Sequence, residues 1–447
     1  MKELTSGKPG RLILAFALPI AIGNIFQLCY SFADVWIVGN ILGNDALAAV
    51  GSTTTLNDLI VGFLIGLTNG FAVITAQKFG AKDMDGMRKS VAHTAMLGMA
   101  VSAVLTLFSL VFLTPILNAL NIPAEHFENA KAYAGVILAG MTASMIYNVC
   151  ASVLRAIGDA VTPLIFLVIS AVMNVGLDYL LISKTELGVS GAAYATVISQ
   201  AVSAVLCLVY IYIKYPQLHL SRGDFSFNRE LARSLFSCGI SMGLMSSLVC
   251  FGTVALQSSI NTFGTNIIVA HTAARKLTGF FMMPFAVLGM TMSAYCAQNY
   301  GAEKYSRIRK GVFTAVLYAW IWCIVLFILI YGFAPAMLKM ITSTEVAEII
   351  DTADLYLRVN CILYFVTAVI SVFRNSLQGI GDHRTPIVSS GIELIGKVLI
   401  VVFLAGRLGY WAIIISEPIV WVLMVIPLIV KLLSNPAMKK RTETESA

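Results

Sequence analysis

Two polar side chains stand four residues apart inside an apolar stretch of the chain. Asn174 and Asp178 lie in SAVMNVGLDYLLI, residues 170–182. Residues four apart share one face of a helix. An amide and a carboxylate on one face offer oxygen atoms of the kind that hard cations prefer, and a carboxylate can also hold a proton. A second acid, Asp34, stands in a similar setting in SFADVWIVG.

The composition places these residues in a membrane protein. Of the 447 residues, 58% are hydrophobic and 12% are charged, and the mean hydropathy is +0.85. Soluble domains contain about 25% charged residues. A β-barrel would show alternating segments of about ten residues, whereas this chain has apolar runs of about 20 residues, each long enough to cross the hydrocarbon as a helix. We count twelve, near 11–38, 46–74, 90–113, 129–152, 162–182, 189–213, 233–258, 266–296, 311–334, 349–373, 386–405 and 409–433.

Asp34 and Asp178 are costly at such positions. An ionised carboxylate at the centre of a membrane helix costs about 3 kcal/mol on insertion scales. It persists only if it is paired, protonated or bound to a cation, and no Lys or Arg lies within one helical turn of either residue. We therefore predict cation or proton binding. The alternative is a hydrogen bond between helices, which contributes about 0.6 kcal/mol on average.

The basic residues gather in alternate loops. The amino end, the carboxyl tail and five loops hold 22 Lys and Arg, whereas the intervening loops hold only Lys184, Lys339 and Arg407. This asymmetry predicts that both termini are cytoplasmic. The net charge of +7 follows that topology, so we do not expect a nucleic-acid partner.

The chain contains an internal repeat. LRAIGDAVTP at 154–163 matches LQGIGDHRTP at 377–386, and TAQKFGAKDMDGMRK at 75–89 matches CAQNYGAEKYSRIRK at 296–310. The offsets, 223 and 221, are about half the length. Six spans in each half predict two parallel-repeat six-helix bundles around a central cavity. The predicted parts are the first bundle at 1–213, a cytoplasmic linker at 214–232, the second bundle at 233–433 and a cytoplasmic tail at 434–447.

This pattern resembles the multidrug and toxic compound extrusion (MATE) family. The resemblance rests on the twelve spans, the two halves, the Q-x-x-G loops after spans 2 and 8, and the G-D-x-x-T-P loops after spans 4 and 10. Bacterial members export amphipathic, often cationic drugs in exchange for Na⁺ or H⁺. The resemblance therefore implies a multi-pass antiporter of the bacterial plasma (inner) membrane that works by alternating access.

The DinF-like branch of that family implies an ion site in the first bundle. Its matching residues here are Asp34, Asn174, Asp178 and Thr196, the last in GVSGAAYATVIS. They would hold Na⁺ or H⁺ as the coupling ion, with no other cofactor. The branch also implies a hinge at Pro19, since a proline removes one helical hydrogen bond and kinks the helix. The plainer interpretations are a local backbone bond for Thr196 and a fixed kink at Pro19.

Several residues are candidates for a substrate cavity in this interpretation. Flexible thioethers suit promiscuous binding surfaces, and an acid attracts cationic substrates. These candidates are Gln27, Tyr30, Asp58, Met242, Met282 and Met283. Ordinary packing is the alternative for the methionines, and a polar position near the outer end of a span is the alternative for Asp58.

The second half carries different charges. At the repeat offset, Asn174 corresponds to Lys397 and Asp178 to Val401, so the ion site is single. A second charged cluster is predicted instead, either as a salt-bridge network or as a further coupling site. Its members are Arg374, Glu393, Lys397 and Glu417. We expect the charged residues at the start of the eighth span to snorkel or to contact Glu417 and not to form a proton relay; these are His271, Arg275 and Lys276. We expect His93 to be solvated.

Two rival functions remain to be compared. A flippase for a lipid-linked oligosaccharide precursor would need a basic cavity, for which Arg275, Lys276, Arg358 and Lys397 are available. An enzyme would need a catalytic constellation at membrane depth, and the chain has no HExxH, no GxSxG and no clustered histidines. We therefore predict a transporter and not an enzyme.

The expected partners of this transporter are small drugs, the coupling cation and membrane lipid. The expected oligomeric state is a monomer.

Overall fold

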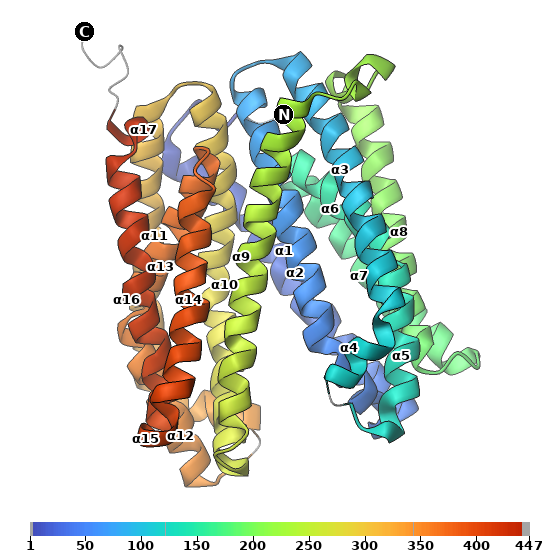
Figure 1. The fold of residues 1–447 in the computed structure, drawn as a ribbon, viewed down its shortest axis with the longest axis vertical. Helices are drawn as coiled ribbons and strands as arrows, with labels where there is room; N and C mark the ends of the chain where they lie inside the picture. Colours follow the sequence, from blue (N-terminus) through green and yellow to red (C-terminus); the bar gives the residue numbers. More distant parts are fainter. Residues whose placement is uncertain (1–2, 121, 343, 440–447) are drawn as a thin grey trace. The chain divides into compact units, whose positions relative to one another are not determined.

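The computed structural model describes residues 3–120, 122–342 and 344–439, and every regular element in them is a helix. The last part of the predicted tail, 440–447, lies outside the described residues. The elements are α1 (Pro9–Leu42), α2 (Asn44–Gly80), α3 (Met84–Val111), α4 (Leu113–Ala119), α5 (Ala124–Ala139), α6 (Met141–Ala156), α7 (Val161–Lys184), α8 (Val189–Lys214), η1 (Pro216–Leu218), η2 (Arg222–Phe225), α9 (Arg229–Ile260), α10 (Thr265–Gly301), α11 (Tyr305–Thr342), α12 (Ala347–Ile362), α13 (Tyr364–Gly379), α14 (Arg384–Phe403), α15 (Ala405–Leu408), α16 (Tyr410–Ser434) and α17 (Pro436–Lys439) (Figure 1).

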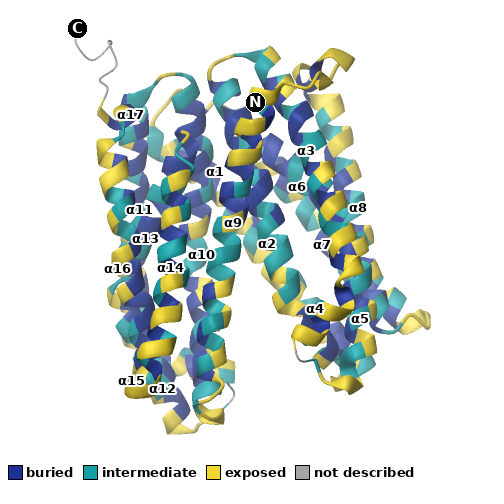
Figure 2. Cartoon of the chain, in the orientation of Figure 1, coloured by how far each residue is buried: buried dark blue, intermediate teal, exposed yellow. Residues whose placement is uncertain are grey.

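The helices agree with the predicted membrane fold. Ten of the described helices are long and apolar enough to cross a membrane, or up to twelve if each of two bent pairs counts as one span. The predicted all-α fold with twelve spans is therefore confirmed. Figure 2 shows buried residues toward the inside of each bundle and exposed ones on its outer faces. On α3 the exposed side chains include Val104, Leu107 and Val111, at 66%, 67% and 63%, which is the apolar surface that lipid requires.

The described chain divides into two compact units. Unit 1 contains Ala15–Gly243, and unit 2 contains Leu4–Leu14 and the chain from Leu244 onward. Helix α1 therefore begins in unit 2 and continues in unit 1, while α9 begins in unit 1 and continues in unit 2. The bundle and linker bounds proposed from the sequence stay a prediction.

The fourth and tenth predicted spans are each broken. The run 129–152 falls on α5 and α6, which are bent by 44°, and the run 349–373 falls on α12 and α13, bent by 55°. The first break is at Gly140, where a Cβ atom would stand 2.2 Å from Val197 on α8. The second break, at Leu363, lies 223 residues later. The repeat thus includes the bends as well as the sequence motifs.

The G-D-x-x-T-P loops are helix-capping structures. Asp159 accepts hydrogen bonds from the backbone N–H of Thr162 at 3.0 Å and from its hydroxyl at 2.7 Å. Asp382 accepts the same pair from Thr385, at 3.1 and 2.8 Å. The glycine before each aspartate has a φ of +86° or +91°, which costs glycine little and other residues much more. The repeated motif is explained by the first turns of α7 and α14.

The Q-x-x-G loop of the second half fixes the start of α1. The Leu4 N–H donates to Gln298 Oε1 at 2.9 Å, and Asn299 Nδ2 donates to the Leu4 carbonyl at 3.2 Å. Arg307 adds a bond from Nη1 to the Gly7 carbonyl at 2.8 Å. These contacts hold the amino-terminal segment within unit 2.

A corresponding contact in unit 1 fixes the start of α9, and it shows that the expectation for His93 was wrong. His93 is 1% exposed. Its Nδ1 donates to the Lys89 carbonyl at 2.8 Å, and its Nε2 accepts the Asn228 N–H at 3.0 Å. A histidine with one donor and one acceptor nitrogen is neutral. The segment before α9 folds back over α3 and removes this imidazole from solvent, which local sequence could not show.

The same segment gives a pH-dependent prediction. Asp224 accepts bonds from the Ser221 N–H at 2.7 Å and from its hydroxyl at 2.8 Å. The backbone bond from Ser221 is the main cause of a lowered pKa for the Asp224 carboxyl. Because the pKa of this carboxyl is lower in the folded protein, its ionised form stabilises the fold at any pH above its unfolded pKa of about 3.9. This stability is lost as the pH falls through the folded pKa.

Asp224→Asn should therefore lower the unfolding temperature by a few degrees at pH 7, and the difference should shrink below about pH 4. Thermal unfolding across pH checks it, with the exposed Asp45→Asn as control; a pH-independent difference would contradict the assignment.

Glycines allow α2 and the first part of α9 to pack closely inside unit 1. A Cβ atom on Gly66 would lie 2.6 Å from the Met242 carbonyl oxygen, and one on Gly70 would lie 2.5 Å from Gly239 Cα. Gly66 and Gly70 are four residues apart, as are Gly239 and Gly243. Membrane helices use such small-xxx-small pairs to bring their backbones together.

We expect Gly70→Val to destabilise the protein, because its side chain would meet the α9 backbone, which cannot rotate away. The expected loss is about 3 kcal/mol, at the upper end of the usual cost of overpacking. The measurement is unfolding in detergent. Gly176→Val is a matched control on α7, because no atom lies within 4 Å of its added Cβ. Equal losses in both variants would show that helix propensity, and not the crossing, accounts for the effect.

Candidate functional site

The predicted ion-binding residues lie together in unit 1. Asp34 comes from α1, Asn174 and Asp178 from α7, and Thr196 from α8. Asp178 is 0% exposed and Asn174 is 3% exposed. The Asp34 and Asp178 carboxyl groups are close enough to interact electrostatically. Two interacting carboxyl groups favour a proton or a cation beside them, since two bare carboxylates would repel each other.

The Asn174 amide lies between Asp178 and the backbone of α8. Its nitrogen donates to Asp178 Oδ2 at 3.2 Å, and its oxygen accepts the Thr196 backbone N–H at 3.3 Å. The amide therefore joins the α7 carboxylate to α8.

Buried oxygen atoms without hydrogen-bond partners surround this site. In the described residues they include Oδ1 of Asp34, Oδ1 of Asp178, Oγ of Ser199 and Oε1 of Gln200. Tyr30, Asn174, Thr196, Ser199 and Gln200 are among the residues lining a small cavity of about 10 Å³, roughly the space of one water molecule. Unpartnered acceptor oxygens in a dry setting suit a small hard cation. The four predicted residues therefore fit a Na⁺ or a proton.

The sequence reasoning missed Ser199 and Gln200. They follow Thr196 by three and four residues, so all three share one face of α8. That spacing was available in the sequence. Serine and glutamine in membrane helices often bond locally, however, and only the packing of α8 on α7 shows that these two face the ion-site residues.

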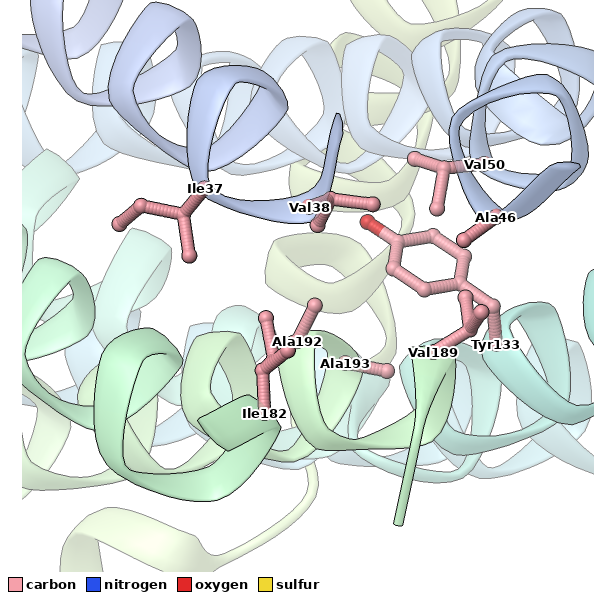
Figure 3. Close-up of a cluster of buried hydrophobic side chains, with 9 residues drawn as sticks. All are labelled: Ile37, Val38, Ala46, Val50, Tyr133, Ile182, Val189, Ala192 and Ala193. Atoms are coloured by element: carbon pink, nitrogen blue, oxygen red, sulfur yellow. The ribbon is translucent and has the colours of Figure 1, made fainter. Parts of the chain in front are cut away.

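An apolar cluster lies one helical turn beyond the polar residues. Val38 follows Asp34 by four residues, Ile182 follows Asp178 by four, and Ala192 precedes Thr196 by four. All three belong to one buried cluster from five helices, whose other members are Ile37, Ala46, Val50, Tyr133, Val189 and Ala193. Figure 3 shows the Tyr133 ring reaching from α5 toward Val38 and Val50. This layer separates the polar residues from one end of unit 1.

The other candidates from the first half are more scattered. Pro19 lies within the continuous helix α1. Gln27 is exposed and lies three residues before the half-buried Tyr30 on α1. Asp58 is exposed on α2.

The methionine candidates divide between the units. Met242 is 4% exposed and lies at the α2–α9 crossing in unit 1. Met282 and Met283 are half-buried on α10 in unit 2. Their part in a substrate cavity stays a prediction, as it does for Gln27, Tyr30 and Asp58.

The second predicted cluster forms a connected ion-pair network in unit 2. Lys397 Nζ lies 2.9 Å from Glu393 Oε1 and 3.7 Å from Glu417 Oε1. Arg374 Nη2 lies 3.9 Å from Glu393 Oε2. Arg275 Nη1 lies 2.7 Å from Glu417 Oε1. Contact with Glu417 was one of the two alternatives predicted for Arg275. Glu393, Lys397 and Glu417 are each at most 6% exposed.

Comparison with known proteins identifies the family. The family model described as MatE matches residues 19–180 and 241–404, well over half of the 447 residues. The chain belongs to the MatE family. It is therefore a multi-pass membrane transporter and not an enzyme, as predicted.

Individual MatE relatives match almost the whole chain. The probable multidrug resistance protein YoeA of Bacillus subtilis is 26% identical over 414 residues, which cover 90% of this chain and 89% of YoeA. The multidrug export protein MepA of Staphylococcus aureus is 23% identical over 91% of this chain and 90% of MepA. A solved outward-facing MATE family transporter of the MOP superfamily, 24% identical, matches with a TM-score of 0.90 over 98% of each chain and supports the fold. These relatives give no support to the flippase alternative.

Proposed function

We propose that this MatE transporter is an antiporter that exports amphipathic, often cationic drugs in exchange for Na⁺ or H⁺. The observation that carries the proposal is the contact of Asp34 with Asp178, surrounded by buried oxygens that lack donors. Drug export is supported by the names of YoeA and MepA. Ion coupling is supported by the chemistry of the residues and by the DinF-like resemblance of their positions.

The Asn174 amide links the ion-site residues of two helices. Its nitrogen donates to Asp178 Oδ2 and its oxygen accepts the Thr196 backbone N–H, so it ties the Asp178 carboxylate to the backbone of α8. In the proposed cycle a cation or proton at Asp178 competes with this amide for the carboxylate, so the ion changes the bonds between α7 and α8. A ligand shifts a conformational equilibrium only through such a difference between states.

Pro19 supplies a place for α1 to bend. A proline at this position cannot donate to the carbonyl of Ala15, four residues earlier. Ala15 is also the first α1 residue that belongs to unit 1. In the proposed cycle, the ion at Asp34 changes the packing of the later part of α1 while the contacts of Leu4 hold its beginning.

We further propose that the protein works as a monomer in the bacterial plasma membrane, in contact with its lipid, with both termini cytoplasmic.

The test is transport by the purified protein in sealed vesicles. A Na⁺ gradient and a pH gradient of equal size are imposed separately, and uptake of a fluorescent cationic drug is followed. We expect one of the two gradients to drive uptake against the drug's concentration gradient. Transport that ignores both gradients would refute the antiport proposal.

A further inference from the structure

A pocket in unit 2 has features of a binding site that the proposed ion cycle does not use. Its volume is about 330 Å³, at the small end of the usual range for ligand pockets of about 300–1,000 Å³. Helices α9, α10, α12 and α16 contribute to its wall. The pocket therefore lies inside one bundle and is separate from the Asp34 site in unit 1.

The wall of this pocket combines apolar and basic groups. Leu256, Ile413 and the Tyr356 ring provide apolar surface, and Arg275 and Lys276 provide positive charge. Glu417 is the single acid among the lining residues. It is already engaged by Arg275 at 2.7 Å and by the Tyr356 hydroxyl at 3.0 Å. The acid is therefore satisfied by the protein and is not available to a cationic ligand.

Lys276 is the basic residue of this pocket that has no partner in the protein. Within the described chain its ammonium group makes no hydrogen bond or ion pair. It lies ten residues into the span predicted at 266–296, about 15 Å along the helix from the start of that span, and its side chain is exposed. A lysine within a span is costly unless it meets water, an ion or a polar ligand. The neighbouring Thr272 hydroxyl lines the same pocket and is exposed.

The charged residues around the pocket also give it a positive net charge. Arg275, Arg374 and Lys397 form ion pairs with Glu393 and Glu417 in this part of unit 2, and Lys276 lines the same pocket as Arg275 and Glu417. Four cations and two carboxylates leave the group with a net charge of +2. Since Arg275 is held by Glu417, Lys276 alone offers an uncommitted charge to a ligand in the pocket. A single free ammonium favours a monoanion over a phosphate dianion.

We infer that this pocket binds the carboxylate of a small amphipathic monoanion. Lys276 forms the ion pair, Thr272 donates a hydrogen bond, and the apolar part of the ligand packs against Leu256, Ile413 and Tyr356. The site extends the ligands of this protein beyond the cationic drugs of the proposed function. It does not depend on ion coupling, because it is a binding site within unit 2.

The experiment measures equilibrium binding to the full-length protein in phosphatidylcholine nanodiscs. The probes are 2-naphthoate, the neutral 2-naphthamide and the cationic 2-naphthylmethylamine, which share one ring system. We expect naphthoate to bind most tightly. Lys276→Gln should weaken naphthoate at least about tenfold, the effect of losing one ion pair, and should leave naphthamide unchanged. Lys339→Gln, a lysine in the last turn of α11, is the matched control and should change neither probe.

A second variant tests the location. Thr272→Trp fills the pocket without changing its charge, so it should abolish binding of both naphthoate and naphthamide. Phosphatidylglycerol, a monoanionic lipid without a carboxylate, is then added as a competitor: competition that requires Lys276 would assign the site to a lipid headgroup and overturn the inference, and its absence supports a free carboxylate. The inference is overturned if the amine binds as tightly as naphthoate, if Lys276→Gln equals Lys339→Gln, or if Thr272→Trp retains naphthoate binding.

Discussion

Asp178→Asn should reduce ion-driven drug transport by about 100-fold, within the range of typical coupling energies. The carboxamide has nearly the shape of the carboxyl group but cannot release a proton or carry the charge that holds Na⁺. It can still bond to Asn174 and Asp34, so the helices should stay packed. The measurement is drug uptake into vesicles under the gradient that drives the wild-type protein.

Stability separates this effect from misfolding. Asp178 is fully buried, and its Oδ1 has no partner. Removing its charge should leave the unfolding temperature equal to or above that of the wild type, because an unpaired buried polar group is costly. Asp45→Asn, the same change at an exposed position of α2, should transport normally. Wild-type transport by Asp178→Asn would remove the coupling role of this residue.

Glu393→Gln should destabilise the protein by about 3–5 kcal/mol, the usual cost of removing one member of a buried ion pair. The Lys397 side chain is 3% exposed and that of Arg374 is 11% exposed. Both contact Glu393, so its neutralisation leaves two buried cations with too little negative charge. The measurement is unfolding of the purified protein in detergent.

A double-mutant cycle shows whether the pair accounts for the loss. Adding Lys397→Met to Glu393→Gln removes the nearer cation and keeps an apolar stem of similar length. We expect the double variant to recover about 1–3 kcal/mol, the usual coupling between residues in contact. Asp351→Asn, at an exposed acid of α12, should cost almost nothing. Additive effects of the two changes would mean that Lys397 and Glu393 are not energetically coupled.

The sequence alone determined the spans and the repeat. A membrane helix satisfies its own backbone, so a long apolar run is enough to predict it. The G-D-x-x-T-P loops were visible for a similar reason, since the aspartate accepts hydrogen bonds from the threonine three residues later, in the first turn of the next helix. The shared face of Asn174 and Asp178 also followed from helix geometry, and the acids were notable because charge is expensive in lipid.

Contacts between helices were decided only by the tertiary structure. The pairing of Arg275 with Glu417, the placement of Ser199 and Gln200, and the burial of His93 under the segment before α9 all depend on how helices pack. So do the exchange of the first turns of α1 and α9 between units and the free ammonium of Lys276 in its pocket. Local sequence fixes which residues share a face of one helix. The rotation and register of that helix against its neighbours are set by packing between side chains that are distant in the chain, such as Gly70 against Gly239.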